Sequence, residues 1–239
     1  MLALLEERFQ VLAPDLPGFG HSPALDAGTP PAPEALTDAL ERDLDAAGWD
    51  RPHVAGSSLG GWIALELARR GRVASVVAIS PAGMWTRRES LYAQALLKLT
   101  RLLASAPAPE RALGLWPVRV ASGAIVFGRP ARGKPAELAE MARLLVGSEA
   151  FDRARELAHA TQPKGLNEIS VPTLIAWGTR DRLLLPRQAR RFVREIPGAE
   201  LRWLDGLGHL AMQDDPELVA RTIAEWIRQS PARPAAAPA

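Results

Sequence analysis

The stretch His53-Val54-Ala55-Gly56-Ser57-Ser58-Leu59-Gly60-Gly61 decides how this 239-residue chain folds. It predicts a short strand that runs straight into a tight turn and then into a helix ending near Gly71. Residues Gly56, Ser58 and Gly60 fit the pattern Gly-x-Ser-x-Gly. Such a turn holds its central serine in a strained conformation, so the residues two before and two after it should lack side chains. The pattern is typical of a nucleophilic serine, although a small-residue helix cap would give the same letters.

Strands and helices alternate on both sides of this turn. Further strands are predicted at residues 9–13, 73–79, 171–177 and 200–204. Further helices are predicted at residues 2–8, 34–47, 186–195 and 216–228. The order indicates an α/β protein with a mostly parallel sheet that helices cover on both faces.

One long segment breaks this alternation. Residues 84–168 show helical spacing of leucines without a convincing strand. We therefore expect a helical cap inserted into a core made of residues 1–83 and 169–230. The last segment, residues 231–239, is rich in proline and alanine and is predicted to be disordered.

Composition excludes several classes of site. The chain has no cysteine, which excludes a disulfide scaffold, a thiolate nucleophile and cysteine-ligated metals. Its four histidines are scattered and form no His-Glu-x-x-His pair, so we do not expect a histidine metal site. We expect no organic cofactor either, because residues 18–23 begin like the dinucleotide pattern Gly-x-Gly-x-x-Gly but have Pro23 in place of the third glycine. The net charge is only +2 and the arginines are interspersed with acids, so nucleic acid is not an expected partner.

No membrane attachment is expected from the sequence. No segment reaches the ~18 apolar residues of a membrane span. The first residues carry acids where a signal peptide would have its apolar core. The expected location is the cytoplasm.

A nucleophilic Ser58 needs a base and an acid that orients the base. His209 lies just past the last predicted strand, and Asp181 follows the strand at 171–177 after a short turn. Parallel strands place their carboxyl ends at one edge of the sheet, where sites form. The three side chains are therefore expected to meet there. Asp205 is the rival acid, but it is only four residues from His209 and is expected to shape the turn.

These motifs together resemble the α/β-hydrolase superfamily. The likeness rests on the order Ser58, Asp181, His209 and on three stretches. They are Pro14-Asp15-Leu16-Pro17-Gly18-Phe19-Gly20-His21-Ser22, the strand from Val171 to Asp181, and Gly208-His209. The resemblance runs from about residue 9 to residue 227, less specifically through the predicted cap. It implies a capped serine hydrolase of esterase or lipase type acting on a small acyl substrate.

The resemblance also implies a role for each site residue. Ser58 would attack the carbonyl carbon, His209 would take its proton, and Asp181 would orient His209, while the backbone N–H of Leu59 would bind the oxyanion. Carboxylesterases, lactonases, carbon–carbon bond hydrolases and cofactor-free perhydrolases share this pattern. Dehalogenase and epoxide-hydrolase relatives use Asp at the nucleophile position. The serine at position 58 therefore disfavours both of these activities.

The start of the chain departs from the family pattern. Residues 9–13 correspond to the fourth strand, so the first three strands have no counterpart, and strand four would either leave a gap or pair with strand five. The His-Gly turn that supplies a second oxyanion donor is also absent, a loss that typically lowers the rate about 10²–10³-fold. We expect either an N-terminally truncated record of a longer enzyme or a catalytically silent fragment that associates through its exposed sheet edge.

Overall fold

The computed structural model describes residues 1–105, 113–132, 134–148 and 150–230. The predicted disorder of residues 231–239 lies outside this part of the chain. The described strands form one parallel sheet in the order β1-β2-β3-β4. Their bounds are β1 His53–Ser57, β2 Ser75–Ile79, β3 Thr173–Gly178 and β4 Glu200–Leu204. These positions confirm four of the five predicted strands.

The register places the carboxyl ends of the strands side by side. Ser57, the last residue of β1, pairs with Ile79, the last residue of β2. Gly178 at the end of β3 likewise pairs with Leu204 at the end of β4. The segments that follow these strands therefore emerge at one edge of the sheet, as open parallel sheets arrange their sites.

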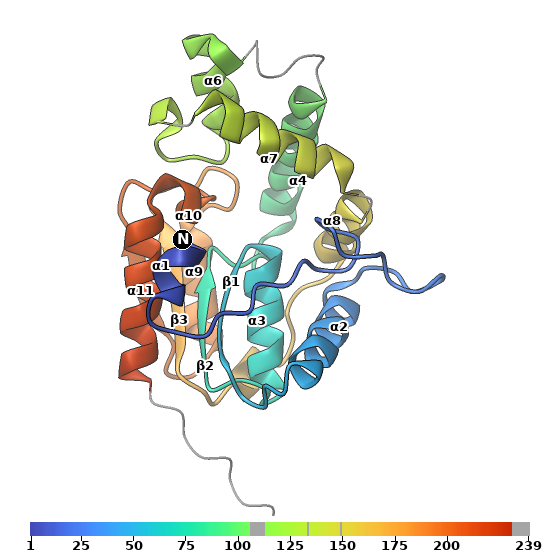
Figure 1. The fold of residues 1–239 in the computed structure, drawn as a ribbon, viewed down its shortest axis with the longest axis vertical. Coiled ribbons are helices and arrows are strands. Elements are labelled where there is room, and N and C mark those ends of the chain that lie inside the picture. The colour runs from blue at the N-terminus through green and yellow to red at the C-terminus, as the bar shows by residue number, and fades with distance from the viewer. Residues whose placement is uncertain (106–112, 133, 149, 231–239) are drawn as a thin grey trace, which may run out of the picture.

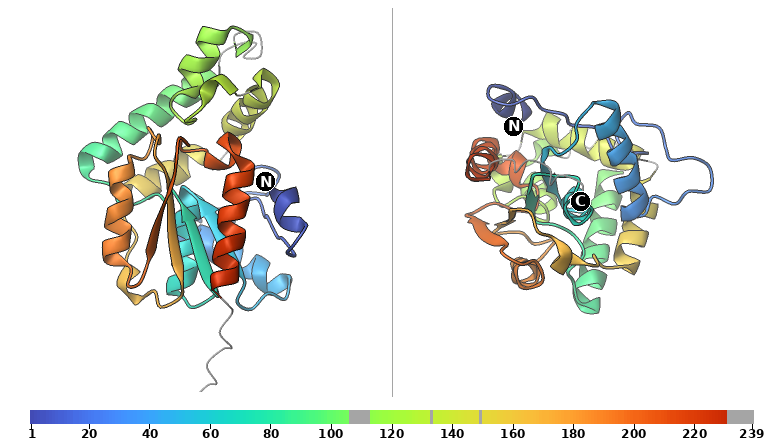
Figure 2. Two further views of the ribbon diagram at one scale, coloured as in Figure 1. Left: turned by 90° about the vertical axis from the view of Figure 1, so that its left-hand side faces the viewer. Right: turned by 90° about the horizontal axis from the view of Figure 1, so that it is seen from below.

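Helices cover both faces of the sheet, as Figure 2 shows. One face carries α2 (Pro33–Ala46), α3 (Leu59–Arg69) and α9 (Ala189–Glu195), and the other carries α1 (Leu2–Glu6) and α11 (Pro216–Gln229). Along β2, Val76 and Ala78 pack into the first cluster and Val77 and Ile79 into the second. This alternation follows from the two-residue period of a strand.

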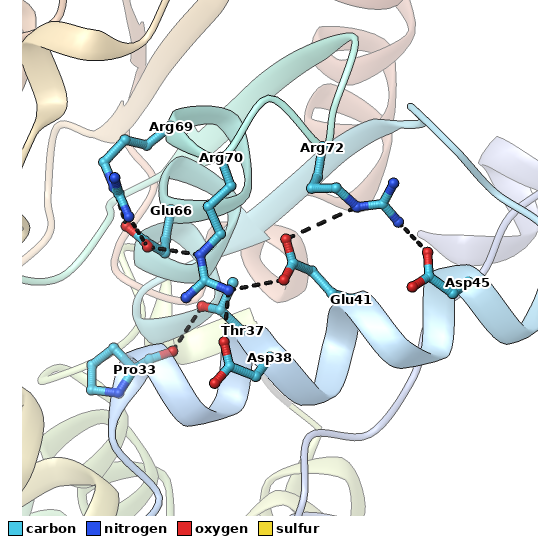
Figure 3. A network of polar contacts seen from close by, with 9 residues as sticks. All are labelled: Pro33, Thr37, Asp38, Glu41, Asp45, Glu66, Arg69, Arg70 and Arg72. Carbon is cyan, nitrogen blue, oxygen red and sulfur yellow. Dashed lines mark hydrogen bonds and ion pairs between the residues drawn. The ribbon is translucent and has the colours of Figure 1, made fainter.

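A polar network fastens α2 to α3, the helix that begins beside Ser58 (Figure 3). The Arg70 guanidinium donates to Asp38 at 2.6 Å, to Glu41 at 2.9 Å and to Glu66 at 2.9 Å. Arg72 extends the network along α2. Because one guanidinium joins carboxylates from both helices, the network fixes the packing of α2 on α3.

The described residues between β2 and β3 form helices and no strand. Their bounds are α4 Arg87–Ala104, α6 Trp116–Gly123, η1 Pro130–Arg132, α7 Pro135–Gly147, α8 Phe151–Ala160 and η2 Leu166–Glu168. Figure 1 shows α4, α6 and α7 reaching beyond the sheet. Pro107 and Pro109 predict a break in the helical segment, but they lie outside the described residues. None of the described helices is long and apolar enough to cross a membrane.

The predicted strand at residues 9–13 is wrong. The segment is irregular chain, with Gln10, Leu12 and Ala13 exposed. Phe9 and Val11 contact the apolar cluster that α1 and α11 share. Pairing of this segment with β1, one of the two expected arrangements, does not occur, and β1 is an edge strand of the sheet that the described strands form. A strand needs a partner for its backbone N–H and C=O groups, and none lies beside this segment.

Candidate active site

Ser58 occupies the turn between β1 and α3 in a conformation that is rare for a residue with a side chain. Its backbone has φ 55° and ψ −117°. The turn is held by hydrogen bonds from the Ser58 N–H to the carbonyl of Ile79 and from the Ala82 N–H to the carbonyl of Ser58, both at 3.0 Å. Strain of this kind persists only where the surroundings enforce it, and it is common at active sites.

Of the two glycines expected beside Ser58, only one occupies a position where a side chain would not fit. A Cβ atom at Gly56 would lie 2.1 Å from the carbonyl oxygen of Gly60, so position 56 excludes every side chain. A Cβ atom at Gly60 would meet nothing within 4 Å. The tighter position on the helix is Gly61, whose Cβ would lie 3.0 Å from Pro81. The close approach of α3 to the β2 loop, which the motif does not encode, explains this difference.

Asp181 and His209 meet as the sequence predicts. The imidazole Nδ1 of His209 lies 2.9 Å from Oδ2 of Asp181, and both side chains are buried. The other carboxylate oxygen, Oδ1, accepts hydrogen bonds from the backbone N–H groups of Leu183 at 2.9 Å and Leu184 at 2.8 Å. A carboxylate only accepts, so Nδ1 carries the proton and Nε2 is left as the basic nitrogen.

Asp205, the rival acid, does not take part in this pair. It is exposed, and its Oδ1 accepts a hydrogen bond of 3.3 Å from the hydroxyl of Thr179. The same hydroxyl accepts from the Gly206 N–H at 2.8 Å. Asp205 therefore shapes the turn before His209.

Ser58, Leu59 and His209 border one cavity of about 680 Å³. Its wall is mostly apolar and draws on α3, α4, α6, α7, α8 and the loops after β3 and β4. Polar or charged side chains in the wall come from Ser57, Ser58, Thr100, Arg155, His159 and His209. No hydrogen bond joins the described side chains of Ser58 and His209. The alcohol and the imidazole border the same cavity, and the imidazole is joined on its other side to the carboxylate of Asp181.

The helix start beside Ser58 faces the same cavity. Leu59 is the first residue of α3, and the Ser58 side chain does not cap this helix. The first N–H groups of a helix lack partners within it and favour negative charge. This placement suits the Leu59 N–H to its predicted role as an oxyanion donor.

A carboxylate missed by sequence reasoning holds the loop that carries His209. Oδ2 of Asp214 accepts from the N–H groups of Gly208 and Gly128, each at 2.7 Å. A Cβ atom at Gly208 would lie 2.4 Å from the nitrogen of Gly128, so the two backbones are in direct contact. Gly208 is only six residues from Asp214, but Gly128 is 86 residues away, so no local pattern marks the contact between the two segments.

Two residues on α8 were also missed. His159 stacks on Trp85 with ring centroids 4.2 Å apart, and its Nδ1 lies 2.9 Å from the Ser90 hydroxyl. Burial, aided by the cationic Arg155, lowers the pKa of His159 to about 4. The available signal was helical spacing, because the small or apolar residues at 151, 154 and 158 place 155 and 159 on the inner face.

Two tryptophans of the helical segment differ in their relation to the cavity. Trp85 borders the cavity, whereas Trp116 is 59% exposed and is not among the residues that line it. No three His, Asp or Glu side chains within the described part of the chain gather where they could hold a metal ion.

Known proteins resemble this chain in fold and in sequence. The structure of the meta-cleavage product hydrolase CumD from Pseudomonas fluorescens IP01 matches with a TM-score of 0.75. It is 18% identical and covers 96% of this chain and 84% of that one. At that identity the likeness shows the fold alone.

Two curated relatives are closer in sequence. The epoxide hydrolase EphH of Mycobacterium tuberculosis is 35% identical over 208 residues, which cover 81% of this chain and 94% of that protein. The pimeloyl-[acyl-carrier protein] methyl ester esterase of Methylococcus capsulatus is 30% identical over 247 residues and covers 95% of this chain and 87% of that one.

The family model described as the alpha/beta hydrolase family matches residues 1–222. That span includes the turn at Ser58, the helical segment between β2 and β3, and the loop of His209. The parallel sheet with helices on both faces is the fold that this family implies. The chain therefore belongs to the α/β-hydrolase family and is a hydrolase of that type.

Proposed function

We propose that this protein is a serine hydrolase that cleaves an ester or a related acyl substrate. One observation carries the proposal: a strained serine at a strand-to-helix turn shares a cavity with an imidazole whose Nδ1 is bound to a buried carboxylate. Nucleophile, base and orienting acid are the parts that acyl transfer requires. The relative named as a methyl ester esterase supports an ester as substrate.

The reaction would run in two halves. Ser58 Oγ attacks the carbonyl carbon while Nε2 of His209 accepts its proton, and the Leu59 N–H donates to the developing oxyanion. His209 then returns the proton to the leaving alcohol, which leaves an acyl group on Ser58. Water attacks that acyl group with His209 again as the base. Asp181 stays ionised and stabilises the imidazolium. The hydrogen bond between a nucleophile and its base, here Ser58 Oγ and Nε2 of His209, often forms only once substrate is bound.

Epoxide hydrolysis is the rival reaction, because one relative carries that name. Attack by a carboxylate nucleophile on an epoxide gives an ester, which water can cleave at its carbonyl carbon. Attack by Ser58 would give an ether, which has no carbonyl for water to attack. A serine nucleophile would stop after one turnover, so we favour the acyl substrate.

The helical segment supplies the wall of the cavity opposite Ser58. We assign residues 84–168 as a cap that selects the substrate, set on a core of residues 1–83 and 169–230. Most of the residues that line the cavity come from this segment. The mechanism needs no metal and no organic cofactor, since every proton transfer is carried by His209.

A fluorophosphonate probe tests the nucleophile. The probe should label the wild-type protein and should fail to label Ser58→Ala. Ser57→Ala is the matched control, because it removes a neighbouring hydroxyl from the same wall and should still be labelled. Equal labelling of wild type and Ser58→Ala would refute the assignment. Hydrolysis of 4-nitrophenyl esters together with no turnover of styrene oxide would separate the acyl reaction from the epoxide reaction.

A second candidate function is association through the sheet edge. β1 pairs with β2 on one side only, and Ala55 in its middle is exposed. An unpaired strand edge is a template for another strand. In this reading the protein is catalytically weak or silent and acts by self-association. Esterase turnover by a purified monomer would argue against it.

A further inference from the structure

The cavity has a polar corner that acyl transfer at Ser58 does not use. Five residues of α8 line the cavity at helical spacing: Phe151, Ala154, Arg155, Ala158 and His159. The two alanines are almost fully buried, and α8 packs against both α2 and α4. Between these small residues the helix presents Arg155 and His159, four residues apart and therefore on one face.

Arg155 is an unusual residue for such a wall. Its side chain is only 6% exposed, and its Nε and Nη1 atoms are buried without a hydrogen-bond partner. Arg155 is also the one Lys, Arg, Asp or Glu among the described residues that line the cavity. Buried donors without acceptors destabilise the fold, so the unpaired N–H groups of Arg155 favour a ligand that supplies acceptor atoms.

The partners that Arg155 does have leave most of its charge available. Nη2 lies 3.6 Å from a carboxylate oxygen of Asp152 and 3.7 Å from one of Glu156. Both distances exceed hydrogen-bond length, and both carboxylates are more than half exposed. Water screens exposed carboxylates, so they compensate a buried guanidinium only in part.

His159 adds a neutral polar group beside this cation. Its Nδ1 is engaged by the Ser90 hydroxyl, and stacking on Trp85 fixes the plane of the ring. The lowered pKa keeps the ring uncharged at neutral pH, so it adds no second positive charge to the corner. Its Nε2 remains the ring atom that can serve a ligand.

We propose that Arg155 and His159 form a subsite for a substrate carboxylate, so that the natural substrate is an ester that also carries an acid group. This inference rests on the proposed ester hydrolysis. The ester carbonyl would lie at Ser58, an apolar linker would follow the leucine-rich wall, and the carboxylate would pair with Arg155. Charge-assisted hydrogen bonds are the strong class, and the low dielectric of the wall favours them.

Paired substrates test the subsite. 4-Nitrophenyl monoesters of dicarboxylic acids with six to ten carbons are each compared with the methyl-capped diester of the same length. Wild type should prefer the free acid at one length or more. Arg155→Gln should lower kcat/KM for that acid by about tenfold to a hundredfold, chiefly through KM, and should leave the capped ester within about twofold. Arg155→Lys should restore part of the preference.

The control for charge is Arg153→Gln. Arg153 lies on the same helix with its side chain 60% exposed, and it is not among the residues lining the cavity. It should leave both substrates unchanged. If Arg155→Gln fails to fold by circular dichroism, Arg155→Met, which also removes the charge, is compared with wild type on both esters. An unchanged ratio between acid and capped ester in whichever of these two variants folds overturns the proposal.

A binding measurement separates this inference from the proposed function. Calorimetry measures binding of octanedioic acid monomethyl ester to Ser58→Ala and to Ser58→Ala with Arg155→Gln. If wild type shows no esterase activity but binding of this ligand needs Arg155, the subsite is retained and the ester hydrolase is rejected. Esterase activity with equal binding to both variants would do the reverse.

Discussion

At the scale of single residues, Asp181 divides its two oxygens between the imidazole and the backbone. One oxygen meets Nδ1 of His209, and the other accepts the N–H groups of Leu183 and Leu184. The backbone bonds fix the carboxylate, so the carboxylate can fix the ring. Replacing the carboxylate of Asp181 by an amide should therefore lower turnover far more than it lowers the stability of the fold.

Asp181→Asn should lower kcat for a 4-nitrophenyl ester about 10³–10⁴-fold, the effect known for an orienting acid changed to its amide. The amide can donate to Nδ1, which would move the imidazole proton to Nε2 and remove the base. Steady-state kinetics measure the loss, and circular dichroism checks the fold. Asp205→Asn is the control for the rival acid and should stay within about twofold of wild type. A large loss for Asp205→Asn with little for Asp181→Asn would reverse the two roles.

His159 should make the fold sensitive to acid. Its pKa of about 4 in the folded protein lies below the ordinary histidine value of 6.5. Between these values the unfolded chain binds more protons than the native one, so stability rises with pH. The contribution of neutral His159 to the stability of the fold is fully present above pH 6.5 and is lost as the pH falls toward 4. The groups that face the ring are Arg155, Ser90 and Trp85, and the cation adds to the effect.

Thermal unfolding at pH 7 and pH 4.5 measures this linkage. His159→Gln should lose less Tm on acidification than wild type does. His21→Gln, which changes an exposed histidine, should lose as much as wild type. An equal drop in Tm for all three proteins would contradict the assignment of acid sensitivity to His159.

Sequence predicted candidate site residues that follow strands, and it did not indicate the polar residues of the cavity and its loops that do not follow strands. Ser58, Asp181 and His209 each come after an apolar strand, and strand ends of a parallel sheet share an edge. Arg155 lies within a helix rather than after a strand, and Asp214 accepts from Gly128, which is 86 residues away. Local spacing indicates the buried face of a helix, but it does not indicate which cavity that face borders.

At the scale of elements, one buried carboxylate ties the helical segment to the core. Glu89 on α4 is 2% exposed and accepts from Arg191 and Arg187, with a further bond from the Thr86 N–H. Burial pushes the pKa of Glu89 up, but hydrogen bonds from Arg191, the Thr86 N–H and Arg187 outweigh it and lower the pKa to about 2. The joint between α4 and α9 is therefore ionic across the neutral pH range.

Glu89→Gln should lower the free energy of unfolding by about 1–3 kcal/mol, because two guanidinium groups lose their charged acceptor. Urea unfolding measures the change. Glu137→Gln removes the exposed partner of Lys134 at the start of α7 and should change the free energy of unfolding much less, because water screens an exposed ion pair. Equal effects of the two substitutions would mean that the buried joint adds no more than a surface pair.

The need of a strand for a neighbouring strand explains why the strand at residues 9–13 was predicted wrongly. The apolar residues at 9–13 have the composition of a buried strand, and the four strands with partners formed as predicted. Helices such as α2 and α11 depend on local bonds, and their bounds fall within one residue of the prediction at each end. A strand depends on a neighbour, which composition does not supply.

At the scale of the whole molecule, the helical segment and the core meet at the loop of His209. The Leu210 N–H donates to the carbonyl of Val126 at 2.9 Å, and Arg182 donates to the carbonyl of Ala124 at 2.8 Å. Asp214 adds the bonds to Gly128 and Gly208. The segment that forms much of the cavity wall therefore also holds the loop of the proposed base, which links substrate selection to the catalytic geometry.

The edge of β1, which pairs with no further described strand, is where two copies of the chain would associate. If that edge pairs with a second copy, the mass measured by sedimentation equilibrium should rise with protein concentration. Ala55→Lys should reduce the rise, because a lysine on each copy would place like charges together at the paired edge. Ala121→Lys adds the same charge at an exposed position of α6 and should leave the rise unchanged. A wild-type protein that stays monomeric at every concentration would remove the case for association, and esterase turnover by that monomer would leave ester hydrolysis as the function.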